Sequence, residues 1–244
     1  MARAGRRPWR AGEGWSRPGV WKSWASPAFA KGYGGQVARA TPNNLRPRDA
    51  PARKVLLGIG RRTGEDHLME ETGTPAEFFD VVNQDDAVVG RATRREVHAR
   101  GLLHRAVHVL VFNEAGEVFL QKRSQNKDTA PGAWDSSASG HVDAGEDYDG
   151  CAVRELREEI GLALARAPTR WLRLRACEET GNEFVWVYRE DDEGPFTLHP
   201  EEIERGAWYR PAEIVRELRE HPAKFASSFR LIWRELAARG DVAG

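Results

Sequence analysis

The segment 140–162, GHVDAGEDYDGCAVRELREEIGL, constrains this chain more than any other, because it joins a loop containing glycines to a strongly charged amphipathic helix. Glu155, Glu158 and Glu159 stand at positions i, i+3 and i+4 of the helical period, so their carboxylates project from one face while aliphatic neighbours turn toward a core. Like charges at this spacing repel one another and cost helix stability. The cluster is either a solvated helix face compensated by nearby arginines or part of a cation site.

The loop that precedes the helix favours the cation site. Gly140 and Gly145 allow the backbone to approach a ligand closely, which makes Gly140 a candidate substrate contact. Glu146 is placed where it could pair with Arg154, and Gly161 is expected to end the helix. A hard divalent cation such as Mg²⁺ prefers oxygen ligands and shares its shell among carboxylates, waters and substrate phosphates. The loop and helix would supply the protein's part of that shell.

Short β-branched and aromatic runs alternate with helical patterns from residue 77 onward, which predicts an α/β or α+β domain with a mixed sheet and helices packed on it. Thr93 and Glu96 form a capping box for a short helix, and Pro211 and Pro222 each stand where a helix would begin. We expect strands at 77–83, 87–92, 105–113, 117–124, 134–138, 169–179, 182–190 and 206–210, and helices at 93–100, 147–160, 211–220 and 222–239.

The first 68 residues differ from the rest of the chain in charge and composition. Residues 1–68 hold 14 Lys and Arg against 4 Asp and Glu, a net charge of +10, which leaves −10 for residues 69–244. The basic segment is rich in Arg, Gly, Pro and Trp without a sustained period, which predicts a disordered tail. We favour an over-extended or dispensable start before Met69; a transit leader and a basic arm for an anionic surface are the alternatives. The folded domain is expected over 69–244.

Composition excludes several classes of protein. No apolar run reaches the roughly 20 residues that a membrane-spanning helix needs. Two cysteines are too few for a disulfide framework, which indicates a reducing compartment. We therefore expect a cytoplasmic location, or an organellar one if the basic segment is a transit peptide. The negative balance of the folded part disfavours broad binding of nucleic acid.

The segment 140–162 resembles the signature of the Nudix hydrolase superfamily, G-x5-E-x7-R-E-U-x-E-E-x-G-U with U an aliphatic residue; we call it the Nudix box. The resemblance implies an α/β/α sandwich with a mixed sheet over about residues 77–240, and a loop-helix-loop that binds Mg²⁺ or Mn²⁺. It implies that Glu155, Glu158 and Glu159 hold the metal while other box residues keep the loop and helix in shape. Every constrained position matches: Gly140, Glu146, Arg154, Glu155, Leu156, Glu158, Glu159, Gly161 and Leu162.

A narrower resemblance lies outside the box. The blocks LLHRAVHVLVFN, LQKRSQNKDTAPGAWDSSASGH and GNEFVWVY are similar to those of isopentenyl-diphosphate isomerases and of the Nudix hydrolases nearest to them. In the isomerases three His and two Glu hold a divalent metal. His104, His141 and Glu183 fall on three of these positions, and Gly181 replaces the second Glu. The two histidines would serve either a metal or the phosphates of a substrate.

The same comparison bears on the reaction. Ser139 stands where the isomerases have a Cys that delivers a proton, and a hydroxyl is a far weaker acid than a thiol. The isomerases also usually depart from the full box pattern, whereas this chain keeps all the box carboxylates. Both departures favour hydrolysis over isomerisation.

Other side chains have open roles. Lys122 and Arg123 match a basic pair that often meets the diphosphate in relatives, and the alternative is a solvated strand end. His98, one residue out of register with a further isomerase metal position, is interpreted as a surface residue, and His108 as a packed side chain. We expect Trp134 to pack under the box.

The expected reaction is metal-assisted attack of water on a small-molecule diphosphate. The box carboxylates, Glu183 and Glu202 are all candidate general bases. Nucleoside di- and triphosphates, nucleotide sugars and isopentenyl-type diphosphates are candidate substrates, because the fold does not decide among them. An isomerase and a catalytically silent Nudix binding module are the alternative functions, and a homodimer is compatible with the resemblance.

Overall fold

The computed structural model describes residues 76–242, so the basic segment 1–68 and the expected domain start at Met69 lie outside the described residues. No helix within the described range combines the length and apolarity that crossing a membrane requires. In chain order the elements are β1 (Phe78–Val82), β2 (Val88–Thr93), α1 (Arg94–Arg100), β3 (His104–Phe112), β4 (Val118–Arg123), β5 (Trp134–Asp135), β6 (Ala138–His141), α2 (Tyr148–Ile160), β7 (Thr169–Leu174), a 3₁₀ turn at Glu178–Thr180, β8 (Glu183–Asp191), β9 (Ile203–Tyr209), α3 (Pro211–Glu220), a 3₁₀ turn at Pro222–Lys224, and α4 (Ser227–Ala238).

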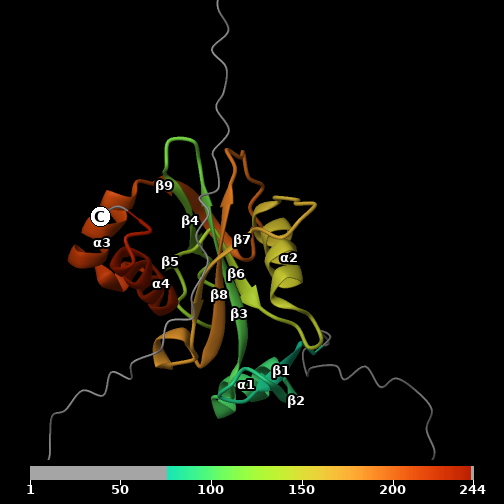
Figure 1. Ribbon diagram of the computed structural model, residues 1–244. Coiled ribbons are helices and arrows are strands. Elements are labelled where there is room, and N and C mark those ends of the chain that lie inside the picture. Colours follow the sequence, from blue (N-terminus) through green and yellow to red (C-terminus); the bar gives the residue numbers. More distant parts are fainter. Residues whose placement is uncertain (1–75, 243–244) are drawn as a thin grey trace, which may run out of the picture. The chain divides into compact units, whose positions relative to one another are not determined.

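A mixed sheet of seven strands, with β3 at its centre, organises the described part of the chain (Figure 1). β3 runs parallel to β8 along its full length, and β8 pairs in turn with β7. On its other edge β3 pairs antiparallel with β6 near its beginning and with β4 at its end. β4 also pairs with β5 and β9. Parallel and antiparallel pairs thus coexist, as the sequence predicts.

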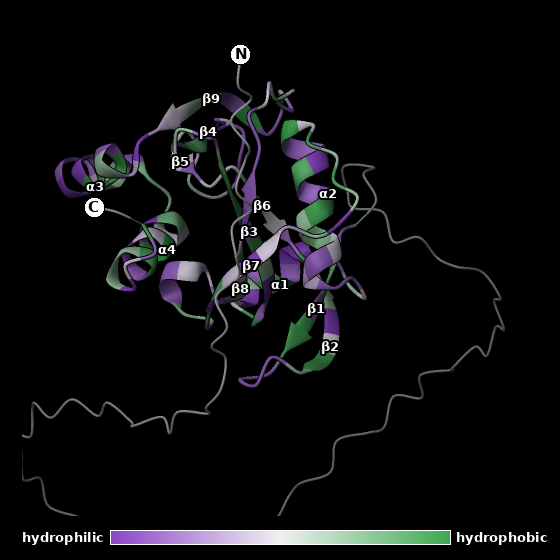
Figure 2. Ribbon diagram, turned by 45° about the horizontal axis from the view of Figure 1, so that its top comes forward, coloured by the Kyte–Doolittle hydropathy of each residue, from purple (hydrophilic) through white to green (hydrophobic). Residues whose placement is uncertain are grey.

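Helices cover both faces of this sheet, with α2 on one side and α3 and α4 on the other (Figure 1). Successive side chains of β3 point to opposite faces of the sheet, so the strand contributes to two hydrophobic cores. Val107 and Val109 pack with α2, whereas Ala106 and Leu110 pack with the α4 side. The hydropathy of α2 alternates along the helix, as expected for an element with one buried face (Figure 2). The arrangement is the α/β/α sandwich that the sequence predicts.

A small β-hairpin and a short helix precede the sheet. β1 and β2 pair antiparallel with Phe78 opposite Thr93, and α1 follows directly. The predicted capping box is present: Glu96 N donates to Thr93 Oγ1 at 3.3 Å, and Thr93 N donates to Glu96 Oε2 at 3.0 Å. This cap fixes the direction in which α1 leaves β2, and therefore where the side chain of His98 lies.

The helix expected at 222–239 begins later than predicted. The chain makes a 3₁₀ turn after Pro222, Phe225 is extended with φ −118° and ψ 144°, and α4 starts at Ser227. The cause is tertiary: Ala226 N donates to Trp134 O at 3.0 Å, and Phe225 forms a parallel bridge with Trp134. A hydrogen bond to a distant strand replaces the first turns of the predicted helix.

The expected position of Trp134 is wrong. Trp134 packs in the core that α3 and α4 cover, edge-on to Tyr209 with ring centroids 5.1 Å apart, whereas the box helix packs in the other core. The expected strand at 134–138 is also two strands, because the chain moves from the edge of β4 to the edge of β3 between Asp135 and Ala138. Trp134 stays on the first of these strands, away from α2.

Candidate active site

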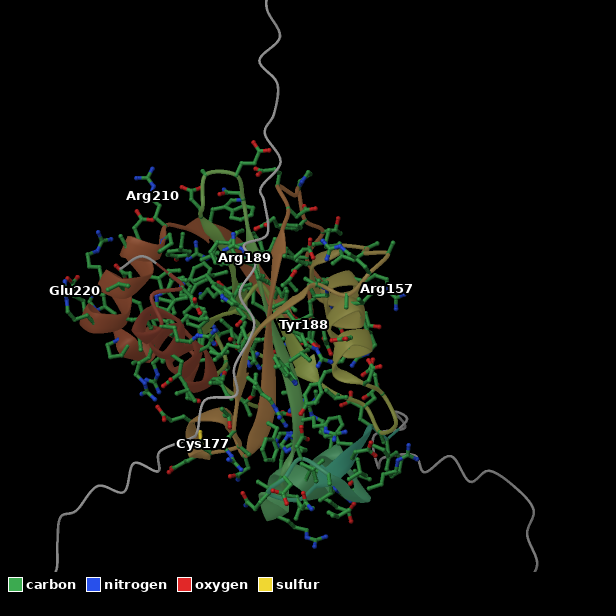
Figure 3. The ribbon with its side chains drawn as sticks, in the orientation of Figure 1. Arg157, Cys177, Tyr188, Arg189, Arg210 and Glu220 are labelled. Carbon is green, nitrogen blue, oxygen red and sulfur yellow. The ribbon has the colours of Figure 1, made fainter. Side chains whose placement is uncertain are left out.

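The Nudix box forms the expected loop and helix. Asp147 caps α2 by accepting a hydrogen bond from Gly150 N at 2.7 Å. Gly161 ends the helix in the left-handed conformation with φ 72°, a geometry that glycine adopts without strain. Arg157, an exposed arginine of α2, points away from the sheet (Figure 3), whereas Glu155 and Glu159 on the same helix are buried.

Two of the three box carboxylates are buried beside β6, and the third is open to solvent. Glu155 and Glu159 are 8% and 5% exposed, whereas the side chain of Glu158 is 49% exposed. Glu159 Oε2 accepts hydrogen bonds from Gln121 Nε2 and from Ser139 N, each at 2.9 Å. One oxygen of Glu159 is therefore held in place, and its other oxygen is left for a ligand.

Burial and mutual repulsion favour the protonated forms of this pair. Burial raises the pKa of Glu155 to about 7, although the neighbouring Arg154 opposes the rise. Burial, and next the negative charge of Glu155, raise the pKa of Glu159 to about 8. A hard divalent cation bound between two adjacent carboxylates offsets the repulsion between their negative charges and favours their ionised forms. The residues therefore fit Mg²⁺ or Mn²⁺.

Arg154 ties the box together. Its guanidinium makes a bidentate pair with Glu146, with Nε donating to Oε1 at 3.1 Å and Nη2 to Oε2 at 2.9 Å. Nη2 also donates to His141 O at 3.0 Å, and Nη1 to Glu155 Oε1 at 2.7 Å. The expected pair of Glu146 and Arg154 is thus present, and the same guanidinium fixes the loop, the end of β6 and one box carboxylate.

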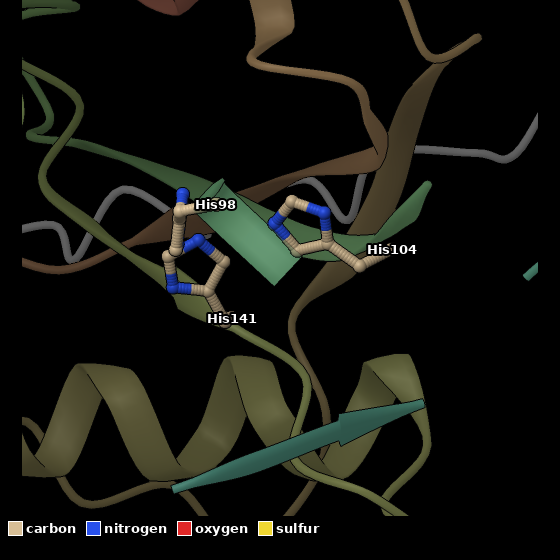
Figure 4. Close-up of side chains that lie close together, drawn as sticks. All are labelled: His98, His104 and His141. Atoms are coloured by element: carbon tan, nitrogen blue, oxygen red, sulfur yellow. The ribbon is translucent and has the colours of Figure 1, made fainter. Parts of the chain in front are cut away.

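A cluster of imidazoles lies at the end of β6. Ligand atoms of His98, His104 and His141 all lie within 4.8 Å of one another (Figure 4). Glu183 Oε1 is 3.0 Å from His141 Nε2 and 3.5 Å from His104 Nε2. These two imidazoles hold the pKa of Glu183 well below its usual range, against the effect of its burial. The parallel pairing that puts His104 opposite Glu183 brings the two residues together.

His104 carries an unused ligand atom. Its Nδ1 lies 2.9 Å from Leu102 O, which can only accept, so Nδ1 donates and Nε2 is the ring nitrogen that faces Glu183. Nε2 is buried and makes no hydrogen bond within residues 76–242. A buried polar atom without a partner is costly, and a metal ion is one way to satisfy it. The cluster therefore fits a metal that accepts imidazole nitrogen.

The structure places His98 differently from the sequence interpretation. Its side chain is exposed on α1, as expected for a surface residue, yet the ring meets His104 and His141 edge-on at centroid distances of 5.4 and 5.1 Å. The part of the His98 ring that packs against the other two imidazoles is desolvated, and this desolvation, followed by the effect of His141 and His104, lowers the pKa of His98 to about 4. From the sequence, His98 is one residue out of register with a metal position and lies on a short helix. Neither feature indicates that its ring reaches the other two imidazoles.

Both groups open into one cavity of about 630 Å³. Its lining contains the three box carboxylates together with His98, His141 and Glu183. Glu202, a candidate general base, also lines the cavity and forms an ion pair with Lys127. The carboxylates and the imidazoles are thus two candidate metal groups within reach of one substrate.

The predicted basic pair is divided between two places. Lys122 and Arg123 are consecutive strand residues, so they point to opposite faces of β4. Arg123 lines the cavity and bonds Asp135 Oδ2 at 3.3 Å. Lys122 pairs with Glu204 at 2.7 Å and lines a separate hollow of about 380 Å³. Of the two residues of this pair, only Arg123 therefore lines the active-site cavity.

Comparisons with known proteins identify the family of this chain. The profile of the NUDIX domain matches residues 102–229. The uncharacterized Nudix hydrolase PA4841 of Pseudomonas aeruginosa is 35% identical over 159 residues, 64% of this chain and 91% of that protein. The uncharacterized Nudix hydrolase YfcD of Escherichia coli K12 is 33% identical over 169 residues, 68% of this chain and 91% of that protein.

Two further matches address the branch and the fold. An isopentenyl-diphosphate Delta-isomerase of Serratia proteamaculans is 30% identical over 165 residues, 66% of this chain and 92% of that protein. The crystal structure of DR0079 from Deinococcus radiodurans has a TM-score of 0.60 and 26% identity, and the match covers 65% of this chain and 98% of that one. The chain therefore belongs to the Nudix family and is a hydrolase of pyrophosphate bonds, in a branch similar to the isopentenyl-diphosphate isomerases.

Proposed function

We propose that this enzyme hydrolyses the diphosphate linkage of a small molecule in a reaction that requires Mg²⁺ or Mn²⁺, by attack of water on phosphorus. The observation that carries the proposal is the pair of buried carboxylates, Glu155 and Glu159, on the wall of a cavity that Glu158 also lines. Bound divalent cations polarise phosphoryl oxygens and lower the pKa of water. The three glutamates would hold them.

The chain's own residues prepare this site. Arg154 orients Glu155, while Gln121 and the backbone of Ser139 orient Glu159. Arg123 contributes positive charge on the cavity wall, where it would attract a diphosphate. These contacts hold the carboxylates before a ligand arrives, so that little reorganisation accompanies binding.

The general base would come from a restricted set. Glu183 is a poor candidate, because two imidazoles hold its pKa well below the usual range and a weakly basic carboxylate abstracts protons inefficiently. The box carboxylates and Glu202 remain. Glu202 lines the cavity from the segment between β8 and β9, on a different element from the metal-holding glutamates.

We further propose that His98, His104, His141 and Glu183 hold a second metal ion. Imidazole nitrogen suits Zn²⁺ or Fe²⁺ better than Mg²⁺. The unpartnered Nε2 of His104 supports this group. The Serratia relative is an isomerase by name, so isomerisation of isopentenyl diphosphate is the second candidate function. Ser139 disfavours it, because a hydroxyl does not replace a thiol as the proton donor.

The test is hydrolysis by the full chain of nucleoside diphosphates, nucleoside triphosphates, nucleotide sugars and isopentenyl diphosphate, with Mg²⁺ or Mn²⁺. The reaction is followed as release of phosphate, pyrophosphate, nucleoside monophosphate or sugar phosphate. We expect metal-dependent release that disappears in Glu159→Gln and persists in Glu220→Gln, a matched change on the exposed end of α3 (Figure 3). Proton exchange into isopentenyl diphosphate without phosphate release would instead establish the isomerase.

A further inference from the structure

One wall of the active-site cavity is built from buried polar side chains that neither metal group uses. His108 on β3 and Asp135 on β5 are 4% and 2% exposed, and both line the cavity. His108 Nδ1 lies 2.8 Å from Ser136 Oγ and 3.6 Å from Asp135 Oδ1. Arg123 donates to the other oxygen of Asp135 at 3.3 Å. The imidazole is therefore held in one orientation from its Nδ1 side.

The opposite side of the ring is open to the cavity. Nε2 of His108 makes no hydrogen bond within residues 76–242, and His108 lines the cavity. Burial lowers the pKa of His108, so the ring is neutral. The nearby carboxylate of Asp135 favours a proton on Nδ1, which leaves Nε2 as a hydrogen-bond acceptor. Buried polar atoms of this kind need a partner, and a substrate can provide it.

The position of His108 matches the organic part of a substrate. On the paired strands β3 and β6, His108 lies opposite Ser139 and Ala106 lies opposite His141, so these side chains share one face. Two residues along a strand span roughly 6–7 Å. That step, about the length of a diphosphate group, separates the register position of His141 from that of His108. A diphosphate bound at the metal groups would thus direct its organic moiety toward His108.

This wall is unsuited to a hydrocarbon. Thr180, and Ser227 and Ser228 at the beginning of α4, line the same cavity. The apolar residues of the cavity lining are glycines and alanines apart from Val107, which packs in the core beside α2, and Phe79, which stacks on His141 with ring centroids 4.7 Å apart. A hydrocarbon placed here would desolvate buried polar groups without replacing their hydrogen bonds, which costs free energy.

We propose that His108 is a specificity-determining residue that accepts a hydrogen bond from a hydroxyl or N–H group of the substrate's organic moiety, and that this wall rejects isoprenoid diphosphates. The inference rests on the proposed hydrolysis of a diphosphate. Ser136 and Asp135 act as positioning residues, because they fix the ring from its far side.

The test compares ADP, UDP-glucose and isopentenyl diphosphate on the full chain with Mg²⁺. We expect kcat/KM for at least one hydroxyl-bearing substrate to exceed that for isopentenyl diphosphate by roughly 100-fold or more, because a site built to hydrogen-bond a polar group discriminates strongly. The better of ADP and UDP-glucose distinguishes a nucleoside from a sugar as the recognised group. Wild-type protein that prefers isopentenyl diphosphate overturns the proposal.

Two variants test whether His108 causes the preference for a polar substrate over isopentenyl diphosphate. His108→Leu should lower kcat/KM for the preferred polar substrate by roughly 10- to 100-fold, mainly through KM, and leave that for isopentenyl diphosphate little changed. His108→Gln, which keeps a hydrogen-bonding group, should retain part of the preference. Equal losses on every substrate would overturn the specificity role.

The proposed hydrolysis can fail separately. If no substrate is hydrolysed at its diphosphate although Mg²⁺ binds, the proposed hydrolysis fails. Calorimetric affinities for ADP, UDP-glucose and isopentenyl diphosphate then test the specificity role directly, because a polar ligand should bind wild type more tightly and His108→Leu should remove that advantage. Equal affinities would overturn the role of His108 as well.

Discussion

The carboxylate of Glu155 occupies the space that a side chain at Gly140 would need. A Cβ atom built on Gly140 would lie 2.0 Å from Glu155 Oε1 and 2.2 Å from its Cδ, far inside van der Waals contact. Gly140 on β6 thus lets the box helix bring a buried carboxylate against the backbone of the sheet. The first position of the box serves the placement of a proposed metal ligand, which is a stronger requirement than the substrate contact expected from the sequence.

Gly140→Ala should therefore displace Glu155 and abolish most metal-dependent turnover. We expect a loss of about 100-fold or more, because a misplacement near 1 Å has effects of that order. Gly90→Ala is the matched control, since a Cβ there meets nothing within 4 Å. Turnover and Mn²⁺ affinity are measured for both. Unchanged turnover in Gly140→Ala would show that Glu155 is not needed in its observed position.

Glu159→Gln should lower turnover by orders of magnitude while the fold remains intact. The amide keeps the shape of the side chain, and the hydrogen bond from Ser139 N can persist, but the negative charge is lost. Steady-state kinetics with saturating Mg²⁺ and circular dichroism check this expectation. Turnover like that of wild type would remove Glu159 from the catalytic site.

The same variant should change the pH dependence of stability in the absence of metal. The pKa of Glu159 in the folded chain is about 8, above its ordinary value of 4.5, so the folded state binds a proton more tightly than the unfolded state between these values. Stability without metal should fall as pH rises through this window. Glu159→Gln should raise Tm by several degrees at pH 8.5, with little effect below pH 4.5. Thermal melts in chelator provide the measurement, and equal slopes in both proteins would contradict it.

The imidazole cluster predicts a second class of metal binding. His98→Ala and His104→Ala should each weaken the binding of Co²⁺, a spectroscopic probe for imidazole sites, by about 10- to 100-fold. His221→Ala, at the end of α3, is the control. Visible absorption of the Co²⁺ complex reports the site directly. If all three variants bound Co²⁺ with the same affinity, the imidazole cluster would not be a metal site.

Much of the fold could be predicted because the signals are local. The cap of α1, the end of α2 at Gly161 and the start of α3 at Pro211 depend on residues within one turn of the helix boundary. The hairpin of β3 and β4 follows from two β-branched runs on either side of a short turn. Periodicity likewise placed Glu155 and Glu159 on one face of a helix.

The same local reasoning was wrong where contacts between distant parts of the chain decide the structure. The bridge between Trp134 and Phe225 delays α4, although Pro222 marks a helix start in the sequence. Trp134 lies in the core opposite to the one expected, because strand order, which adjacent residues do not encode, decides which face a side chain meets.

The sequence by itself determined the chemistry that the box can offer: three carboxylates on one helix face, a loop tied by Arg154, and the family to which they belong. Only the tertiary structure decided what surrounds that chemistry. His104 meets Glu183 from β8 and His141 from β6, because the parallel pairing of β3 with β8 and the antiparallel pairing of β3 with β6 bring together residues far apart in the chain. Periodicity reports the face on which a side chain lies, whereas its neighbours depend on contacts that only the folded chain makes.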